Sequence, residues 1–112
     1  MSFNRGDIVW VKFPFSDAST AKLRPALIIS NDLVNKTGDH LLMQITSVLR
    51  KDTLSLLIKE TDYSEAPLLK QSELRLHKIF ILNQSLLAGK ITTASPLFMD
   101  SVIENLIKLI QP

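Results

Sequence analysis

Five short segments with the pattern of β-strands, followed by one amphipathic helix, constrain the fold of this chain more than any other feature. Residues 7–13 alternate so that Val9, Val11 and Phe13 share one face, as in a half-buried strand. Four further segments are predicted strands: residues 24–30, 40–49, 53–59 and 72–82. Several short strands in 112 residues predict a mainly β protein, with a small, strongly bent antiparallel sheet or barrel and a C-terminal α-helix.

Helical structure is predicted at three places. Residues 31–39 have turn chemistry with room for one helical turn, and residues 83–89 have the pattern of a short helix that stops at its glycine. The C-terminal helix has Ser95 as its cap and Pro96 at its first position. Apolar residues then recur at helical spacing, which predicts a packed face that extends to the apolar end of the chain: Met99, Val102, Ile103, Leu106 and Ile110.

Composition limits the class of protein. Hydrophobic residues make up 46% of the chain and nothing marks a domain boundary, so residues 1–112 are predicted to form a single domain. The chain has no cysteine, which suits a reducing compartment. Its start lacks a signal-peptide pattern, and no apolar run approaches the roughly 20 residues that cross a bilayer, so we expect a cytoplasmic protein without a membrane partner. The net charge of +2 permits a nucleic-acid partner without requiring one.

An arginine stands at the entrance of the second predicted strand. Pro25 restricts Arg24 to an extended backbone, and Thr46 and Ser47 close the third strand. If these strands are antiparallel neighbours, the guanidinium and the hydroxyls meet at one end of the sheet, where the polar loop 14–22 also emerges. A guanidinium fork and neutral hydroxyl donors suit a phosphodiester and the charge that develops on it during reaction. The alternative is a surface arginine beside ordinary turn-capping residues.

A second polar group lies in the last predicted strand. Alternation places Glu73, Arg75 and His77 on one face, which predicts either a solvent-facing surface with a cross-strand ion pair or, through His77, a group that moves protons. His40 is predicted to be a loop residue. The two histidines lack the spacing of a metal site, so neither a metal nor another cofactor is expected.

Other residues have the chemistry of nucleic-acid contacts. Trp10, on the face opposite Val9, has the option of stacking on a base or of lying half buried under a loop. Four cations are candidates for a basic rim, with plain solvated surface as the alternative: Lys12, Lys22, Arg50 and Lys51.

Four motifs occur in an order that is typical of a known family: GDIVWVKFPF at 6–15, LRPALIISN at 23–31, MQITSV at 43–48 and SELRLHKIF at 72–80. Through them the chain resembles the MazF/PemK toxins of bacterial toxin–antitoxin systems. The resemblance implies a small SH3-like β-barrel with added helices, usually a homodimer. It also implies a cognate antitoxin, whose acidic, flexible tail lies along the RNA groove.

The activity implied by the resemblance is sequence-specific, metal-independent cleavage of single-stranded RNA, especially messenger RNA. The ribose 2′-hydroxyl attacks the adjacent phosphate and leaves a cyclic phosphate and a 5′-hydroxyl. Arg24 and Thr46 match the catalytic pair, with Ser47 beside them, and Arg75 matches an RNA-binding arginine. With the contacts suggested above, the predicted RNA-binding set is Trp10, Lys12, Lys22, Arg75 and His77.

The sequence also departs from the family pattern. The loop 14–22 is compact and polar where many relatives have a longer, glycine-rich loop, so the cleavage sequence does not transfer. The strand with "RLHK" also differs from that of the better-known toxins, so groove residues beyond Arg75 do not transfer. The alternative function is binding without catalysis, either to a protein target, as the gyrase-poisoning toxins of this fold do, or to an antitoxin alone.

Overall fold

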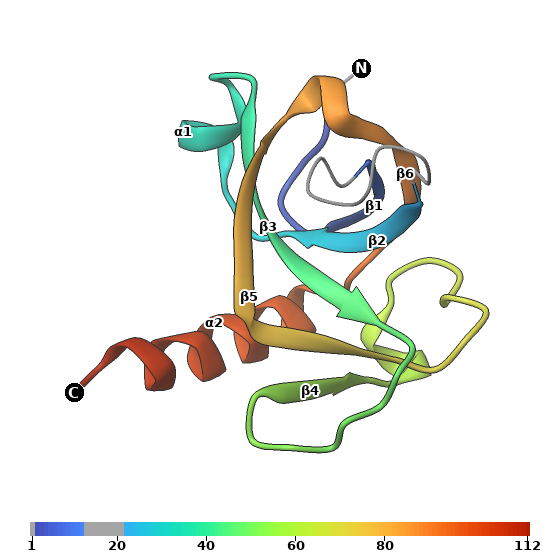
Figure 1. Cartoon of the computed structure of the whole chain (residues 1–112), viewed down its shortest axis with the longest axis vertical. Coiled ribbons are helices and arrows are strands. Elements are labelled where there is room, and N and C mark those ends of the chain that lie inside the picture. Colours follow the sequence, from blue (N-terminus) through green and yellow to red (C-terminus); the bar gives the residue numbers. More distant parts are fainter. Residues whose placement is uncertain (1, 13–21) are drawn as a thin grey trace.

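The described residues, 2–12 and 22–112, form one curled antiparallel sheet and a C-terminal helix in the computed structural model (Figure 1). The strand order is β4-β5-β3-β2-β1-β6. The strands are β1 (Asp7–Lys12), β2 (Leu23–Ile28), β3 (Asp39–Thr46), β4 (Ser55–Ile58), β5 (Ser72–Asn83) and β6 (Leu87–Thr93). The helices are α1 (Asp32–Asn35), α2 (Pro96–Ile110) and the short 3₁₀ turns η1 (Glu60–Asp62) and η2 (Gln84–Leu86).

The predicted class, a mainly β barrel-like fold with a C-terminal helix, is confirmed. All five predicted strands are present within a few residues of the expected bounds, and the helical turn expected in residues 31–39 is α1. Phe13 and most of the predicted loop 14–22 lie outside the described residues. Within the described residues, no helix is long and apolar enough to cross a membrane.

Two apolar clusters pack on the two faces of the sheet. The first contains Ile8 and Leu27 and joins the sheet to Met99 and Val102 of α2. The second cluster lies on the other face, within the curl. It contains Val9 and Ile28, which directly follow Ile8 and Leu27 in the sequence. Since successive side chains point to opposite faces, Ile8 and Val9 enter different clusters, as do Leu27 and Ile28. The continuous apolar run of β2 therefore reflects a strand buried on both faces.

Gly6 and Asp7, at the start of β1, connect this strand to neighbouring segments through hydrogen bonds. Gly6 has φ +94°, a backbone conformation that residues with a side chain rarely adopt. Its N–H donates to the carbonyl of Ile28 (2.8 Å), and its carbonyl accepts from the N–H of Ala94 (2.8 Å). The carboxylate of Asp7 accepts from the N–H of Asn4 (2.9 Å). The pair thus fixes β1 to β2 and to the segment that enters α2.

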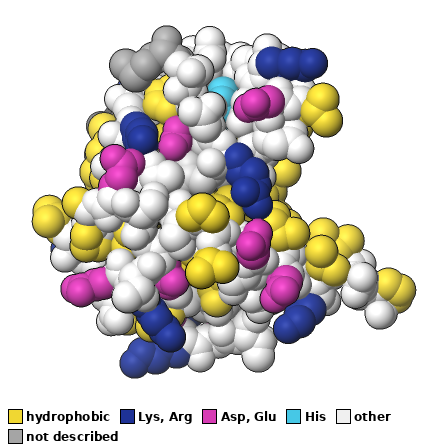
Figure 2. Space-filling model, turned by 180° about the vertical axis from the view of Figure 1, so that it is seen from behind, with side chains coloured by type: hydrophobic (Ala, Val, Ile, Leu, Met, Phe, Trp, Pro, Cys, Tyr) yellow, Lys and Arg dark blue, Asp and Glu magenta, His cyan; other side chains and the backbone are white. Residues whose placement is uncertain are grey.

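Helix α2 begins as predicted but ends differently. The Ser95 hydroxyl accepts from the N–H of Phe98 (3.2 Å), and Pro96 occupies the first position. Phe98, Met99 and Val102 are buried. The prediction of a packed C-terminal end is wrong, because Ile110 is 71% exposed. Figure 2 shows this end of α2 projecting from the body, with hydrophobic side chains on its surface and a notch above it.

The predicted short helix at 83–89 is also wrong. Only Gln84–Leu86 form a single 3₁₀ turn, and Leu87 begins β6, which pairs with β1. Gly89, taken as a helix stop, lies inside this strand with φ +142°. The β1–β6 register shifts twice, between Ile8 and Val9 and between Trp10 and Val11. Such irregularities break the alternation by which a strand is recognised.

His40 is a β3 residue and not a loop residue, which corrects the prediction. It is 1% exposed and its ring meets Phe3 edge to face, with ring centroids 6.3 Å apart. The even-numbered residues of β3 face the curl, so the imidazole enters the second apolar cluster beside its cross-strand partner Leu82. Its Nδ1 has no hydrogen-bond partner among the described residues.

Strand β5 bends sharply along its length (Figure 1). Its pairing with β3 jumps from Met43–Ile79 to Ile45–Leu74, so one residue of β3 spans four residues of β5. Beyond the bend, residues Ser72–Arg75 pair with β4. The bend therefore carries the start of β5, with β4, away from the barrel-like part of the sheet.

Candidate functional site

A proline interrupts the sheet where the candidate site lies. On the β1 side, the carbonyl of Ile28 accepts a hydrogen bond from the N–H of Gly6. On the β3 side, the N–H of Ile29 donates to the carbonyl of Leu41. Since backbone groups of alternate residues point to alternate sides, Pro25 faces β3 but has no N–H to donate. The recorded β2–β3 pairs stop at Ala26–Gln44, one residue before it. The ladder between the two strands thus ends at Pro25, and both strands continue past that point.

Arg24 and Thr46 lie beyond the end of this ladder. The register runs Ile28–Leu42, Leu27–Met43 and Ala26–Gln44. Continued by two residues it sets Arg24 opposite Thr46, and residues opposite each other share a face of the sheet. The predicted antiparallel arrangement of these strands is confirmed. Both residues line one cleft, with a volume of about 620 Å³, within the range of small-ligand pockets.

The cleft draws on parts of the chain that are far apart in sequence. Its floor and sides come from β1, β2, β3 and β6, and the loop 67–70, which precedes β5, forms the opposite wall. Figure 1 shows this yellow-green loop beside the end of β3. The lining residues are Trp10, Lys22–Pro25, Ile45–Val48, Pro67–Lys70, Ser72 and Ile91.

The charges that line the cleft are all positive. They belong to Lys22, Arg24 and Lys70, and no described carboxylate lines it. The side chain of Arg24 is exposed and makes no ion pair or hydrogen bond with a described residue, so within the described part of the chain its guanidinium is free to bind a ligand. Thr46 Oγ1 accepts from the N–H of Val48 (3.1 Å), which fixes the hydroxyl and leaves its proton to donate. Such a cleft favours an anion with apolar groups beside it.

Five of the eight predicted site residues line this cleft: Trp10, Lys22, Arg24, Thr46 and Ser47. Trp10 is 39% exposed and stands opposite Pro25 in the β1–β2 ladder. Lys12, at the end of β1, and His77, at the bend of β5, are exposed and do not line it.

Arg75 does not line the cleft, and its side chain already has hydrogen-bond partners. It is 8% exposed, and its Nη1 donates to Asp52 Oδ1 (3.0 Å) and to Ser55 Oγ (2.6 Å). Glu73 is 2% exposed. The prediction of a solvent-facing surface is therefore wrong for these two residues and correct for His77. The ion pair joins Arg75 to the loop before β4, not to a neighbouring strand.

Sequence reasoning missed the loop 67–70. Lys70 supplies one of the three cations, and Pro67, Leu68 and Leu69 supply apolar surface. Nothing local distinguishes these residues from any exposed loop. Only the approach of this loop to the end of β3 gives them a role, and that approach follows from the bend of β5.

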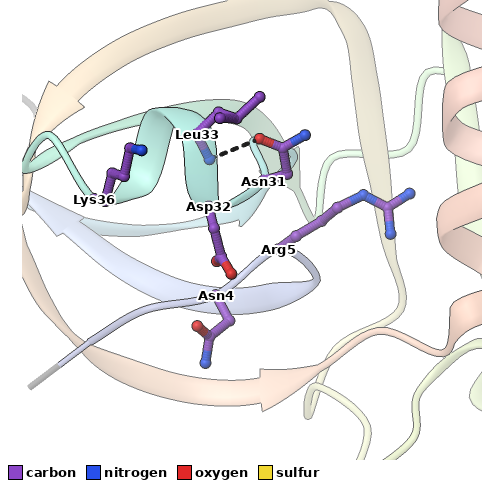
Figure 3. Close-up of a pocket in the computed structure, with 6 residues that line it drawn as sticks. All are labelled: Asn4, Arg5, Asn31, Asp32, Leu33 and Lys36. Carbon is purple, nitrogen blue, oxygen red and sulfur yellow. Dashed lines mark hydrogen bonds between the residues drawn. The ribbon is translucent and has the colours of Figure 1, made fainter.

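A second hollow, of about 600 Å³, lies between the N-terminal segment and α1. Figure 3 shows its residues: Arg5 extends away from α1, while Asp32 points toward Asn4. Asn31 accepts from the N–H of Leu33 (3.0 Å) and so caps α1. Because the hollow mixes both signs of charge and its side chains do not converge, it lacks the features of the cleft. No group of three or more potential metal ligands occurs among the described residues.

Comparisons with known proteins agree with this architecture. The model of a family described as PemK-like, MazF-like toxin of type II toxin–antitoxin system matches residues 4–110. An endoribonuclease in complex with its cognate antitoxin, from a mycobacterial species, is similar over 99% of this chain and 98% of its own, at 20% identity and a TM-score of 0.79. A MazE–MazF structure from Deinococcus radiodurans is similar over 98% and 97%, at 17% identity and 0.80. The toxin MazF-mt6 of Mycobacterium tuberculosis covers 93% and 95%, at 14% and 0.73. At these low identities, the TM-scores establish a shared fold. No curated protein matches the chain.

Proposed function

Because the chain belongs to the PemK-like, MazF-like toxins of type II toxin–antitoxin systems, we propose that it is an endoribonuclease that cleaves single-stranded RNA in this cleft. The observation that carries the proposal is that Arg24 and Thr46 line one cleft, whose charged lining residues are all cations. Two structural neighbours are described as endoribonucleases, which supports the same activity.

Arg24 has the central role in the proposed reaction. The ribose 2′-oxygen attacks the adjacent phosphorus, the bond to the 5′-oxygen breaks, and a 2′,3′-cyclic phosphate and a 5′-hydroxyl form. One proton leaves the 2′-hydroxyl and one reaches the 5′-oxygen. The guanidinium grips the phosphate through paired N–H donors and neutralises the charge that grows on it in the transition state. As a permanent cation it is also placed to donate to the leaving oxygen, but not to act as a free base.

Thr46 and Ser47 supply neutral donors. The Thr46 hydroxyl, oriented by the N–H of Val48, donates to a non-bridging phosphate oxygen. Ser47 is exposed beside it and serves an adjacent oxygen. This chemistry uses a guanidinium and hydroxyls, so we expect cleavage to persist in EDTA.

The rest of the cleft binds the strand on both sides of the scissile phosphate. Lys22 and Lys70 contact flanking phosphates, and a base stacks on the exposed part of Trp10. Stacking on an aromatic side chain is worth about 1–3 kcal/mol per base. Roles for Lys12, Arg75 and His77 in RNA binding stay predictions, and none of these three lines the cleft.

A cognate antitoxin is the proposed protein partner. One mycobacterial neighbour is described as a complex with its cognate antitoxin, and one from Deinococcus radiodurans is described as MazE–MazF. An acidic, flexible tail matches the three cations of the cleft, so we expect it to compete with RNA. Homodimer formation, implied by the family, stays a prediction that light scattering in solution tests.

The test is cleavage of end-labelled, mixed-sequence single-stranded RNA in EDTA. We expect fragments with 5′-hydroxyl ends, which polynucleotide kinase labels without prior phosphatase treatment. Arg24→Ala abolishes cleavage, and Arg24→Lys restores little because the paired donors are lost. Arg24 is exposed, so the fold survives both changes.

Two controls complete the test. Lys78→Ala removes an exposed cation of β5 outside the cleft and leaves activity unchanged. Thr46→Ser keeps a hydroxyl and retains most activity, whereas Thr46→Val does not. A folded wild-type chain that leaves every RNA intact, or an Arg24→Ala variant with full activity, contradicts the proposal.

A further inference from the structure

The turn that follows β3 is held by side chains of two neighbouring strands. This turn, residues 47–51, contributes Ser47 and Val48 to the wall of the cleft. The N–H of Val48 is bound by Thr46, as described above. The N–H groups of Arg50 and Lys51 donate to the two carboxylate oxygens of Glu73, Oε1 at 2.9 Å and Oε2 at 3.2 Å. Lys51 has φ +53°, which is uncommon for a residue with a side chain, so the turn adopts a costly conformation under this constraint.

Glu73 is the direct cross-strand partner of Thr46. The two residues pair in the β3–β5 ladder, so their side chains share a face of the sheet. A buried carboxylate is costly unless it is hydrogen-bonded, and the two backbone donors meet that requirement. Burial disfavours ionisation of Glu73, but the hydrogen bonds from the N–H groups of Arg50 and Lys51, together with one from the Ser55 side chain, outweigh it and hold the pKa below its ordinary value. Glu73 therefore connects the strand position of Thr46 with the path of the turn.

The surroundings show that Glu73 lies outside the cleft. It lines a different hollow, of about 390 Å³, with Leu49, Lys51 and Asp52, and is not among the residues that line the cleft. Its neighbour along β5, Arg75, forms its ion pair with Asp52 instead. Arg75 and Asp52 thus brace the far end of the same loop, while Glu73 holds the end next to Thr46.

We propose that Glu73 is a positioning residue, whose buried carboxylate holds the turn 47–51 so that the hydroxyls of Thr46 and Ser47 face Arg24. The proposal rests on the proposed nuclease function. Without the carboxylate, two backbone N–H groups lose their partners and the turn must move to reach water. That movement displaces Thr46 and Ser47 but leaves the three cations of the cleft in place. The consequence is a loss in kcat with little change in KM.

The first experiment measures cleavage by Glu73→Gln, which preserves side-chain volume and one accepting oxygen. Displacement of a catalytic group by about 1 Å costs up to about 100-fold, so we expect kcat to fall by about 10- to 100-fold. KM stays within about twofold, since the charges that bind RNA remain. Asp52→Asn is the matched control: it weakens the outer brace, keeps the Glu73 clamp, and has a smaller effect.

The second experiment separates positioning from general destabilisation. In a Thr46→Val, Ser47→Ala background, measured under single-turnover conditions with excess enzyme, Glu73→Gln has no further effect if it acts through these two hydroxyls. A loss of equal size in both backgrounds overturns the proposal.

The third experiment tests the clamp without RNA. The measurement is amide hydrogen exchange. We expect the amides of Arg50 and Lys51 to be protected from exchange in the wild type and to exchange faster in Glu73→Gln, while the amides of β2 stay protected. Exposed amides with unchanged cleavage refute the positioning role, as does protection that survives the substitution. A wild type that cleaves no RNA refutes the nuclease instead, and the exchange pattern still reports on the clamp.

Discussion

The salt dependence of RNA binding offers a quantitative test of the cleft. Three cations line it, Lys22, Arg24 and Lys70. Each phosphate neutralised on a single strand contributes about −0.7 to the slope of log K against log salt, so three contacts give about −2.1. Raising the salt fourfold therefore weakens binding about 18-fold for the wild type and about 7-fold for a variant with one contact fewer.

The change that tests this reasoning is Lys70→Ala, because Lys70 is exposed and lies in a loop that no sequence pattern singles out. Fluorescence anisotropy with an RNA blocked by a 2′-deoxy substitution at the scissile position measures binding without cleavage. We expect the slope of Lys70→Ala to be less steep by about 0.7 and that of Lys78→Ala to equal the wild type. An unchanged slope for Lys70→Ala, or an equal loss for Lys78→Ala, refutes the assignment of these charges to the cleft.

Three further substitutions or conditions test the structure behind the cleft. Gly6→Ala forces a side chain into φ +94° and is expected to lower the free energy of unfolding by about 1–2 kcal/mol, measured by urea denaturation; equal stability contradicts the connecting role described for Gly6. Since the pKa of Glu73 lies below its ordinary value of 4.5, its contribution is complete above that pH and is lost as the pH falls through the folded-state value. The melting temperature of the wild type should therefore drop below about pH 4.5 more than that of Glu73→Gln, and parallel curves would exclude this contribution. Pro25→Ala restores an N–H toward β3 and is expected to slow cleavage without loss of stability, with Pro96→Ala, at the first position of α2 and outside the cleft, as the control; full activity together with a protected amide at position 25 would argue against the role given to this proline.

Much of the fold was predictable because its signals are local. Period-two alternation identified β1 and the start of β5, a short apolar run identified β2, and a capping serine followed by proline located the start of α2. The meeting of Arg24 with Thr46 followed from one assumption, that β2 and β3 are antiparallel neighbours. Once the strands are neighbours, the register places the entrance of β2 beside the exit of β3, and both residues line one cleft.

The errors have a different physical origin. Strand β6 was missed because its two register shifts against β1 break the alternation, and Gly89 in its interior imitates a helix stop. The burial of Glu73 depends on Arg50 and Lys51, which come from a turn more than 20 residues earlier in the chain. A glutamate is usually exposed, and no local signal shows that two backbone donors will cover it. The apolar end of α2 is the opposite case, an apolar residue that is exposed. Helical spacing alone does not tell whether another part of the chain is available to cover Ile110.

The cleft exists because the sheet is interrupted on one side of β3 and anchored on the other. Toward β2, Pro25 cannot continue the ladder, so β2 and β3 are not paired with each other where Arg24 and Thr46 lie. Toward β5, Thr46 remains paired with Glu73, whose carboxylate holds the turn beyond. A strand end that lost both connections would fray, and one that kept both would leave no room for a ligand. The open and the fixed side together provide a rigid hydroxyl beside free space, which preorganised electrostatic stabilisation requires.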